Sequence, residues 1–249
     1  MAESNEDSYD PDWWKRLRDE SLERKEAAAA EAAAMAKPGD TVLIVTEGTV
    51  TEPVYFTLLL PLLELSQVTV KVMPGWASHP RHVIESAARE RERQRDRSER
   101  GELGIREPRS FDHVWVVIDT DVAAREGVWP EIVELAKARQ VALAYSSPCF
   151  EYWLLLHGGM TTRADLSTGE AAKAAVKEML DMDYSTNREA AKAALRSLVP
   201  HWPDAARNAE QVRRYHAEAR TPLPANPSTE VCALVRTLND SAPRHLRRL

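Results

Sequence analysis

Five acidic residues stand at or just beyond the ends of short apolar runs. They are Glu47, Glu52, Asp119, Asp121 and Glu151. Carboxylates that converge at one end of a sheet repel one another, which raises their pKa values and costs stability unless cations neutralise them. Magnesium and manganese ions prefer hard oxygen ligands of this kind. The sequence therefore predicts a site for Mg²⁺ or Mn²⁺ among these acids.

Each acid also has a plain structural explanation. One aspartate of the pair Asp119 and Asp121 could form a turn or cap a helix, although two of them directly after an apolar strand favour a metal site. Glu47 stands beside a glycine that favours a turn. Glu52 and Glu151 fall in the first turn of an expected helix, where negative charge is favourable without any ligand. For Glu47, Glu52 and Glu151 both interpretations stay open.

The elements that must position these acids alternate between strands and helices. The first and third apolar runs lack polar alternation, which predicts strands buried on both faces. We expect strands at 41–45, 68–72, 113–118 and 141–145, separated by helices at 52–65, 81–99 and 130–139. Short connections in this order predict an α/β domain with a parallel sheet flanked by helices. Ligands of such sheets bind outside the carboxyl ends of the strands, where the acids lie.

Changes in composition divide the chain into three regions. Residues 1–36 contain alternating acidic and basic residues followed by an alanine-rich stretch. This composition predicts a helical arm that is either solvated or docks a partner chain. Residues 37–160 hold the α/β core. Residues 161–249 place apolar side chains at helical spacing, which predicts a helical extension packed on the core. Within it, Asn226-Pro-Ser-Thr could return to the acidic edge or form a plain turn.

Composition excludes several classes of protein. The chain has 249 residues, of which 43% are hydrophobic, and its formal net charge is −6. A uniformly basic coat for nucleic acid is excluded, because non-specific affinity comes mainly from neutralised phosphates. No apolar run reaches about 18 residues and the N-terminus is acidic, so we expect a cytoplasmic protein without a membrane span. Cys149 and Cys232 have neither disulfide-framework nor zinc spacing.

Basic and histidine residues give weaker signals. The arginines between residues 89 and 100 alternate with acids, and most of these charges should cancel as pairs within the helix. A solvated face is a better explanation than phosphate binding for Arg207, Asn208, Arg213 and Arg214. His157 ends an apolar run, which is typical of a hydrogen-bonded core histidine.

Three motifs resemble the RloB-like proteins, a family that belongs with the Toprim-like domains. The first is Glu-Gly-x-x-Thr-Glu-Pro-x-Tyr-Phe at 47–56, the second is Ser-Pro-Cys-Phe-Glu-Tyr-Trp at 147–153, and the third is Asn-Pro-Ser-Thr-x-Val at 226–231. A strand that ends in Asp-x-Asp lies between the first two. The resemblance covers residues 40–238. The chain differs from the family pattern at Ser147 and in the segment 184–187.

The resemblance implies a Toprim-like fold in which Glu47, Asp119 and Asp121 hold catalytic magnesium or manganese. It places the second acid of the first motif at Glu52 and gives Glu151 a position in the second motif. It also implies a nuclease of an anti-phage, abortive-infection system, with an ATPase encoded nearby as partner. RNA, including tRNA, and DNA are both open as substrates, and so is a homo-oligomer.

Two other functions remain open from the sequence. A haloacid-dehalogenase-like phosphatase also places Asp-x-Asp after a strand, but its usual Gly-Thr is replaced here by Val122-Ala123. Such an enzyme also needs no acid at Glu47. The second alternative is a non-catalytic subunit that senses phage and binds an ATPase. Cleavage of nucleic acid, hydrolysis of a phosphomonoester, and metal binding without cleavage distinguish the three.

Overall fold

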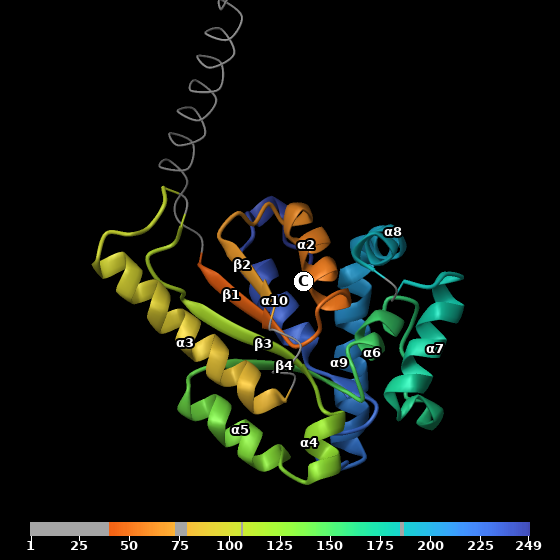
Figure 1. Cartoon of the computed structure of the whole chain (residues 1–249). Coiled ribbons are helices and arrows are strands. Elements are labelled where there is room, and N and C mark those ends of the chain that lie inside the picture. The colour runs from red at the N-terminus through yellow and green to blue at the C-terminus, as the bar shows by residue number, and fades with distance from the viewer. Residues whose placement is uncertain (1–39, 73–78, 106, 185–186) are drawn as a thin grey trace, which may run out of the picture. The chain divides into compact units, whose positions relative to one another are not determined.

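The centre of the fold is a five-stranded sheet with the order β2-β1-β3-β4-β5 (Figure 1). The computed structural model describes residues 40–72, 79–105, 107–184 and 187–249. The strands are β1 Val42–Thr46, β2 Val68–Val72, β3 His113–Asp119, β4 Ala142–Ser147 and β5 Ser228–Thr229. The helical arm expected at residues 1–36 lies outside the described residues.

Four of the strands run parallel, as the sequence predicts. In register, Val42 of β1 faces Val68 of β2 and His113 of β3, while Trp115 of β3 faces Ala142 of β4. β5 pairs with the end of β4 in the antiparallel direction. The α/β class with a mostly parallel sheet, in a Toprim-like arrangement, is confirmed.

Helices cover both faces of this sheet. They are α2 Thr51–Leu62, α3 Pro80–Glu99, α4 Asp121–Glu126, α5 Trp129–Ala138, α6 Glu151–Leu155, α7 Gly169–Leu180, α8 Arg188–Leu198, α9 Trp202–Glu218 and α10 Val231–Ser241. Single 3-10 turns occupy Ala164–Leu166, Val199–His201 and Arg244–Leu246. Among these residues, no helix is long and apolar enough to cross a membrane.

Two hydrophobic clusters sandwich the sheet because successive strand residues point to opposite faces. Val42 and Ile44 of β1 pack with α2 and the helices from α6 onward, whereas Leu43 and Val45 pack with α3, α4 and α5. Every residue of β1 is buried. This strand therefore lies at the centre of both clusters, as its uninterrupted apolar sequence predicts.

The region after residue 160 shares the first cluster. Buried side chains of α7, α8, α9 and α10 pack in it together with strands β1, β3 and β4, and residues 40–249 form one compact unit. The two-residue strand β5 also lies in this region, which the sequence describes only as helical. Neither β5 nor the helices α4 and α10 appear among the elements expected from the sequence.

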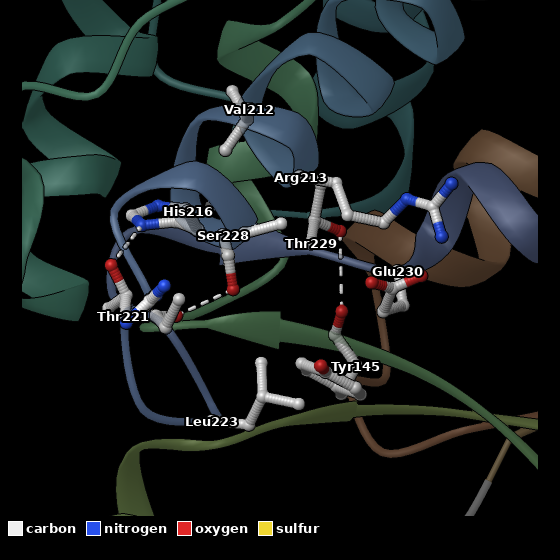
Figure 2. Close-up of a pocket in the computed structure, with 12 residues that line it drawn as sticks. Tyr145, Val212, Arg213, His216, Thr221, Leu223, Ser228, Thr229 and Glu230 are labelled. Carbon is white, nitrogen blue, oxygen red and sulfur yellow. Dashed lines mark hydrogen bonds between the residues drawn. The ribbon is translucent and has the colours of Figure 1, made fainter.

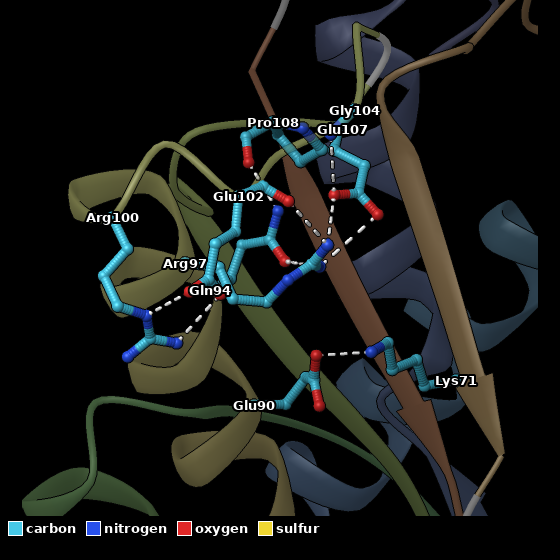
Figure 3. Close-up of polar contacts among 9 residues, drawn as sticks. All are labelled: Lys71, Glu90, Gln94, Arg97, Arg100, Glu102, Gly104, Glu107 and Pro108. Atoms are coloured by element: carbon cyan, nitrogen blue, oxygen red, sulfur yellow. Dashed lines mark hydrogen bonds and ion pairs between the residues drawn. The ribbon is translucent and has the colours of Figure 1, made fainter.

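The arginine-rich helix α3 uses its charges differently from the expected intrahelical pairing. Arg93 and Arg95 do pair with acids of the same helix. Others reach outward, because Arg97 contacts Glu107 at 2.7 Å and Arg100 contacts Glu102 at 2.7 Å (Figure 3). The charges of α3 therefore also fasten the loop that follows it.

Candidate metal-binding acidic site

Hydrogen bonds across the strand ends bring three of the predicted acids together. The parallel ladder between β1 and β3 extends past Thr46, since the Glu47 N–H donates to the Val117 carbonyl at 3.0 Å. The Asp119 N–H donates to Oε2 of Glu47 at 3.3 Å. Oδ1 of Asp119 in turn accepts the Phe150 N–H at 2.9 Å, directly before Glu151. The carboxyl ends of β1, β3 and β4 therefore meet at these side chains.

Glu52 lies in the first turn of α2 and folds back over the loop that follows β1. Its side chain is buried, and a Cβ atom at Gly48 would lie 2.1 Å from Oε2 of Glu52. Only a glycine leaves room for this carboxylate. The turn-forming role considered for the glycine is thus accompanied by a close approach of Glu52.

Glu151 is the first residue of α6 and is buried. The hydroxyl of Tyr184 donates to Oε1 of Glu151 at 3.1 Å. Burial and the neighbouring charge of Glu151 raise the pKa of Tyr184, so the phenol keeps its proton and remains a donor. Glu151 is therefore fixed by a residue 33 positions later in the chain.

Asp121 differs from the other acids because it is exposed. It begins α4, and its Oδ1 accepts the Val122 N–H at 2.7 Å. This contact at the helix start corresponds to the capping role considered for one aspartate of the pair. The helix ends at Gly127, whose φ of 72° is a left-handed conformation that suits glycine.

The acids perturb one another electrostatically. The pKa of Glu47 is raised to about 8, mainly by burial and in smaller part by the charges of Glu52 and Asp121. Burial and then the charge of Glu151 raise the pKa of Glu52 to about 7. The pKa of Asp119 lies well above its ordinary value because of burial and the charges of Glu52 and Glu47. These carboxylates share one poorly solvated region.

Lys173 of α7 is a cation that interacts electrostatically with these acids. Burial alone would lower its pKa, but the charges of Glu151, Asp119 and Glu52 outweigh that effect and raise it. The ammonium group is exposed. It therefore offers positive charge at the edge of the acidic cluster without neutralising the cluster fully, since the acid pKa values stay raised.

A cavity of about 430 Å³ opens beside these groups. It is lined by Thr120 and Asp121 after β3, by Arg125 of α4, and by Lys173 and Asn226. The Thr120 hydroxyl is buried and has no hydrogen-bond partner among the described residues. The cavity thus combines acids, two cations and one unpaired polar group, which suits a polar, anionic ligand.

Within the described residues, the three acids predicted as metal ligands each keep one carboxylate oxygen free of hydrogen bonds, but they do not form a three-ligand metal site. Glu47, Asp119 and Asp121 each use one oxygen to accept a backbone N–H, and no hydrogen bond to their second oxygen occurs in the described part of the chain. Across residues 40–72, 79–105, 107–184 and 187–249, no three acid, histidine or cysteine side chains are arranged to hold a metal ion. Mg²⁺ commonly uses one or two carboxylates and keeps several waters.

Other residues considered from the sequence lie in structural roles. Arg207 pairs with Asp204, Arg213 and Arg214 contact Glu210, and Asn208 donates to the Leu156 carbonyl at 2.7 Å. These contacts support the solvated or structural interpretation of that helix face.

His157 and Cys149 are core groups, as their neighbours in the sequence predict. Nε2 of His157 lies 3.1 Å from the Tyr55 hydroxyl, and burial lowers the pKa of His157 to about 4. Cys149 is buried, and burial raises the pKa of its thiol. Both ring nitrogens of His157 are thus occupied by contacts in the core, and the Cys149 thiol stays protonated at neutral pH.

Two residues that interact with Glu151 were missed by the sequence analysis. Lys173 stands in an alanine-rich helix with no local motif, and Tyr184 stands in the loop between α7 and α8. Only the packing of α7 against α6 brings them to Glu151. The one available signal for Tyr184 was its position in a segment that departs from the family pattern.

The fold and site define an α/β protein with coupled carboxylates at the carboxyl edge of a mostly parallel sheet. The family model for RloB-like proteins matches residues 42–238, which is most of the chain. The chain therefore belongs to the RloB-like family. Searches of curated proteins and of solved structures found no match.

Proposed function

We propose that the protein is a metal-dependent phosphodiesterase, and specifically a nuclease of an anti-phage, abortive-infection system. The observation that carries this proposal is the convergence of Glu47, Glu52, Asp119 and Glu151 at one sheet edge with raised pKa values for the first three. A cluster that costs stability in the free protein is typical of a functional site. The family membership and the Toprim-like arrangement support the same conclusion.

Glu47, Asp119 and Asp121 are the proposed candidates for ligands of Mg²⁺ or Mn²⁺, and an ion that keeps several waters would use one or two of them. When bound, the ion supplies positive charge that stabilises the attacking and leaving oxygens of a phosphodiester. The chain itself holds these acids in place through backbone N–H groups of Asp119, Phe150 and Val122. Peptide donors of this kind are fixed by the sheet and the helix starts, so the carboxylates are oriented before substrate arrives.

Glu52 is the proposed proton-transfer group. Its pKa of about 7 lies near the working pH, where a general base or acid is most effective. Glu151 accepts a hydrogen bond from the Tyr184 hydroxyl, and its interaction with Glu52 contributes to the raised pKa of Glu52. In this assignment, Glu151 is a positioning residue rather than a group that contacts substrate.

The two cations beside the cavity are the proposed contacts for substrate phosphates. Arg125 has no ion-pair partner among the described residues, and Lys173 keeps an exposed ammonium group. Phosphate contacts from lysine and arginine position nucleic acid without reading its sequence. Because the chain as a whole carries a charge of −6, we expect the nucleic acid to be gripped locally or together with a partner.

The test of this function is expression together with the neighbouring ATPase, followed by triggering of the system. Wild type, Glu47→Ala and Asp119→Ala are compared with Glu131→Ala, which removes an exposed acid of α5 far from the sequence motifs. We expect growth arrest and new RNA ends, with tRNA favoured over DNA, in the wild type and in the Glu131 variant only. Sequencing of RNA and DNA ends provides the measurement.

Two results would contradict the nuclease assignment. Equal toxicity of all four proteins at matched levels, without new nucleic-acid ends, would support a non-catalytic subunit. Hydrolysis of a generic phosphomonoester by the purified protein, abolished in the Asp119 variant and without cleavage of RNA or DNA, would support a phosphatase.

A further inference from the structure

A second cavity, of about 460 Å³, lies behind the segment that borders the acidic site. It is enclosed by α9, by the loop 220–225 and by strand β5, with Tyr145 of β4 on the opposite wall (Figure 2). The segment 226–230 separates the two cavities, since Asn226 lines the first and Glu230 lines the second. The proposed nuclease function makes no use of this space.

The walls of the second cavity are mainly apolar. Val212 of α9 and the ring of Tyr145 line it, and Leu223 stands at its mouth with 73% of its surface exposed. Trp129 packs edge-on against Tyr145 with ring centroids 4.8 Å apart, and this contact helps to hold the Tyr145 ring in place. An exposed leucine beside an aromatic ring favours contact with a flat ligand of low polarity.

Some polar groups in the cavity already have a hydrogen-bond or ion-pair partner, and we call these committed. Groups without such a partner among the described residues are called available. His216 is committed, because Nε2 lies 2.9 Å from the Pro227 carbonyl and Nδ1 lies 3.2 Å from the Thr221 hydroxyl. Arg213 is committed to Glu210 at 2.7 Å. By contrast, the described residues give no hydrogen-bond or ion-pair partner to the carboxylate of Glu230, which is therefore available.

Two further groups are available beside Glu230. The Tyr145 hydroxyl and the Arg220 guanidinium line the cavity and likewise lack a side-chain hydrogen bond or ion pair among the described residues. Burial is the main cause that raises the pKa of Glu230, although the charges of Arg213 and Arg236 act in the opposite direction without forming an ion pair with it in the described part of the chain. The cavity therefore offers one acceptor pair, one hydroxyl and one cation.

We propose that this cavity binds a guanine nucleotide. Guanine is flat and presents two adjacent N–H donors, which match the two oxygens of the Glu230 carboxylate. Tyr145 and Leu223 contact the faces or edges of the base, and Arg220 at the cavity mouth contacts the phosphate. Adenine and uracil lack a pair of adjacent donors on the Watson–Crick edge, so they leave Glu230 incompletely satisfied.

The nucleotide has two sources with the same chemistry, a free mononucleotide and a guanosine within a single strand. To distinguish them, calorimetry in EDTA measures the equilibrium binding of GMP and of the oligoribonucleotides UUGUU and UUUUU. We expect GMP or UUGUU to bind at least tenfold more tightly than AMP or UUUUU respectively. The full chain with Asp119→Asn should bind equally well, so this result does not depend on the nuclease function.

Three variants make the assignment specific. Glu230→Gln should remove the preference for guanine, because an amide cannot accept both N–H groups. Arg220→Gln should weaken binding of GMP about tenfold and leave guanosine unchanged. Arg214→Gln, on α9 but outside the cavity, should bind like the wild type, and unchanged melting temperatures confirm that the variants fold. Equal binding of GMP and AMP together with equal binding of UUGUU and UUUUU, or an unchanged preference in Glu230→Gln, would overturn the proposal.

Discussion

Glu47, Glu52 and Asp119 are the residues whose acid-base properties depart furthest from those of ordinary exposed acids. Each has lost water, and each faces another carboxylate rather than a salt-bridge partner. Such groups destabilise the folded protein in their charged form. The same environment makes them effective ligands and proton carriers, because a bound cation or a single proton relieves the repulsion.

The pH dependence of stability tests this environment. The pKa of Glu47 rises from 4.5 to about 8 on folding, so between these values the folded protein holds a proton that the unfolded chain has lost. In EDTA the free energy of unfolding should therefore fall as the pH rises from about 5 to 8, by at most about 1.4 kcal/mol per pH unit for one such group. Thermal unfolding at closely spaced pH values measures this slope.

The matched variant and the metal provide the controls. Glu47→Gln should reduce the slope, with the remainder due to Glu52 and Asp119, and Mg²⁺ should restore stability at pH 8, since it binds the folded state. His157 acts in the opposite direction, because its lowered pKa of about 4 removes stability as the pH falls from 6.5 toward 4. The metal-free protein should thus be most stable in mildly acidic buffer. A flat profile in EDTA between pH 5 and 8 contradicts this account.

Gly48→Ala tests the close packing of Glu52. The new methyl group would meet the carboxylate of Glu52, which is the end of a flexible side chain and can move. We expect a small loss of stability but a roughly 100-fold loss of nuclease activity, because the proton-transfer group is displaced. Gly104→Ala is the control, since its nearest neighbour would be 3.9 Å away. Full activity in Gly48→Ala would remove Glu52 from the reaction.

The residues of the site could be predicted only where a strand end marks them. Glu47 and Asp119 follow apolar runs, and their approach follows from the rule that parallel strands share a carboxyl edge. Lys173 and Tyr184 carry no such mark, because their positions depend on how α7 packs against α6. Long-range packing of this kind leaves no periodic signal in one sequence.

At the scale of elements, two polar side chains in and directly after helix α3 should contribute differently to the free energy of unfolding. Gln94 is buried and donates to the Pro108 carbonyl at 2.6 Å, whereas Arg100 is exposed and contacts Glu102 within the same loop (Figure 3). A buried hydrogen bond leaves an unsatisfied group when it is broken, but an exposed ion pair is replaced by water.

Two substitutions, one in α3 and one directly after its end, should separate these effects. Gln94→Ala should lower the free energy of unfolding by about 1–2 kcal/mol, because it leaves the Pro108 carbonyl without its donor. Arg100→Ala should leave the free energy of unfolding nearly unchanged, because water replaces an exposed ion pair. Chemical denaturation of both variants, in low and high salt, gives the comparison. Equal effects of the two substitutions would contradict the structural account.

Most strands and helices could be predicted from the sequence, and the missed ones share a physical cause. β5 has two residues and exists through its pairing with Ser146 and Ser147, so no local pattern identifies it. α4 has six residues and begins at once after the strand, which leaves less than two turns of periodicity. α10 follows a proline-rich segment that obscured its start.

At the scale of the whole molecule, residues 40–249 carry both hydrophobic clusters of the described structure. Most of the free energy of folding comes from such burial. The preceding segment is rich in alanine and charge, and its boundary near residue 36 remains a prediction from composition.

Deletion of residues 1–36 should therefore leave a folded, metal-binding protein. We expect a cooperative unfolding transition and a Mg²⁺-induced rise in melting temperature that matches the full chain within about 3 °C, which corresponds to roughly 1 kcal/mol. Circular dichroism during heating measures both. An insoluble product in the absence of any partner would show that the arm belongs to the core and that the boundary is wrong.

The two margins of the sheet are poor templates for strand addition from another molecule. On one side, β5 is two residues long and directly follows Pro227, which cannot donate a hydrogen bond. On the other, β2 carries Lys71, whose ammonium group is paired with Glu90 of α3. Intermolecular β-pairing, the usual start of fibrous aggregation, is thereby disfavoured at both margins. Any assembly of copies of this chain should accordingly use helix surfaces.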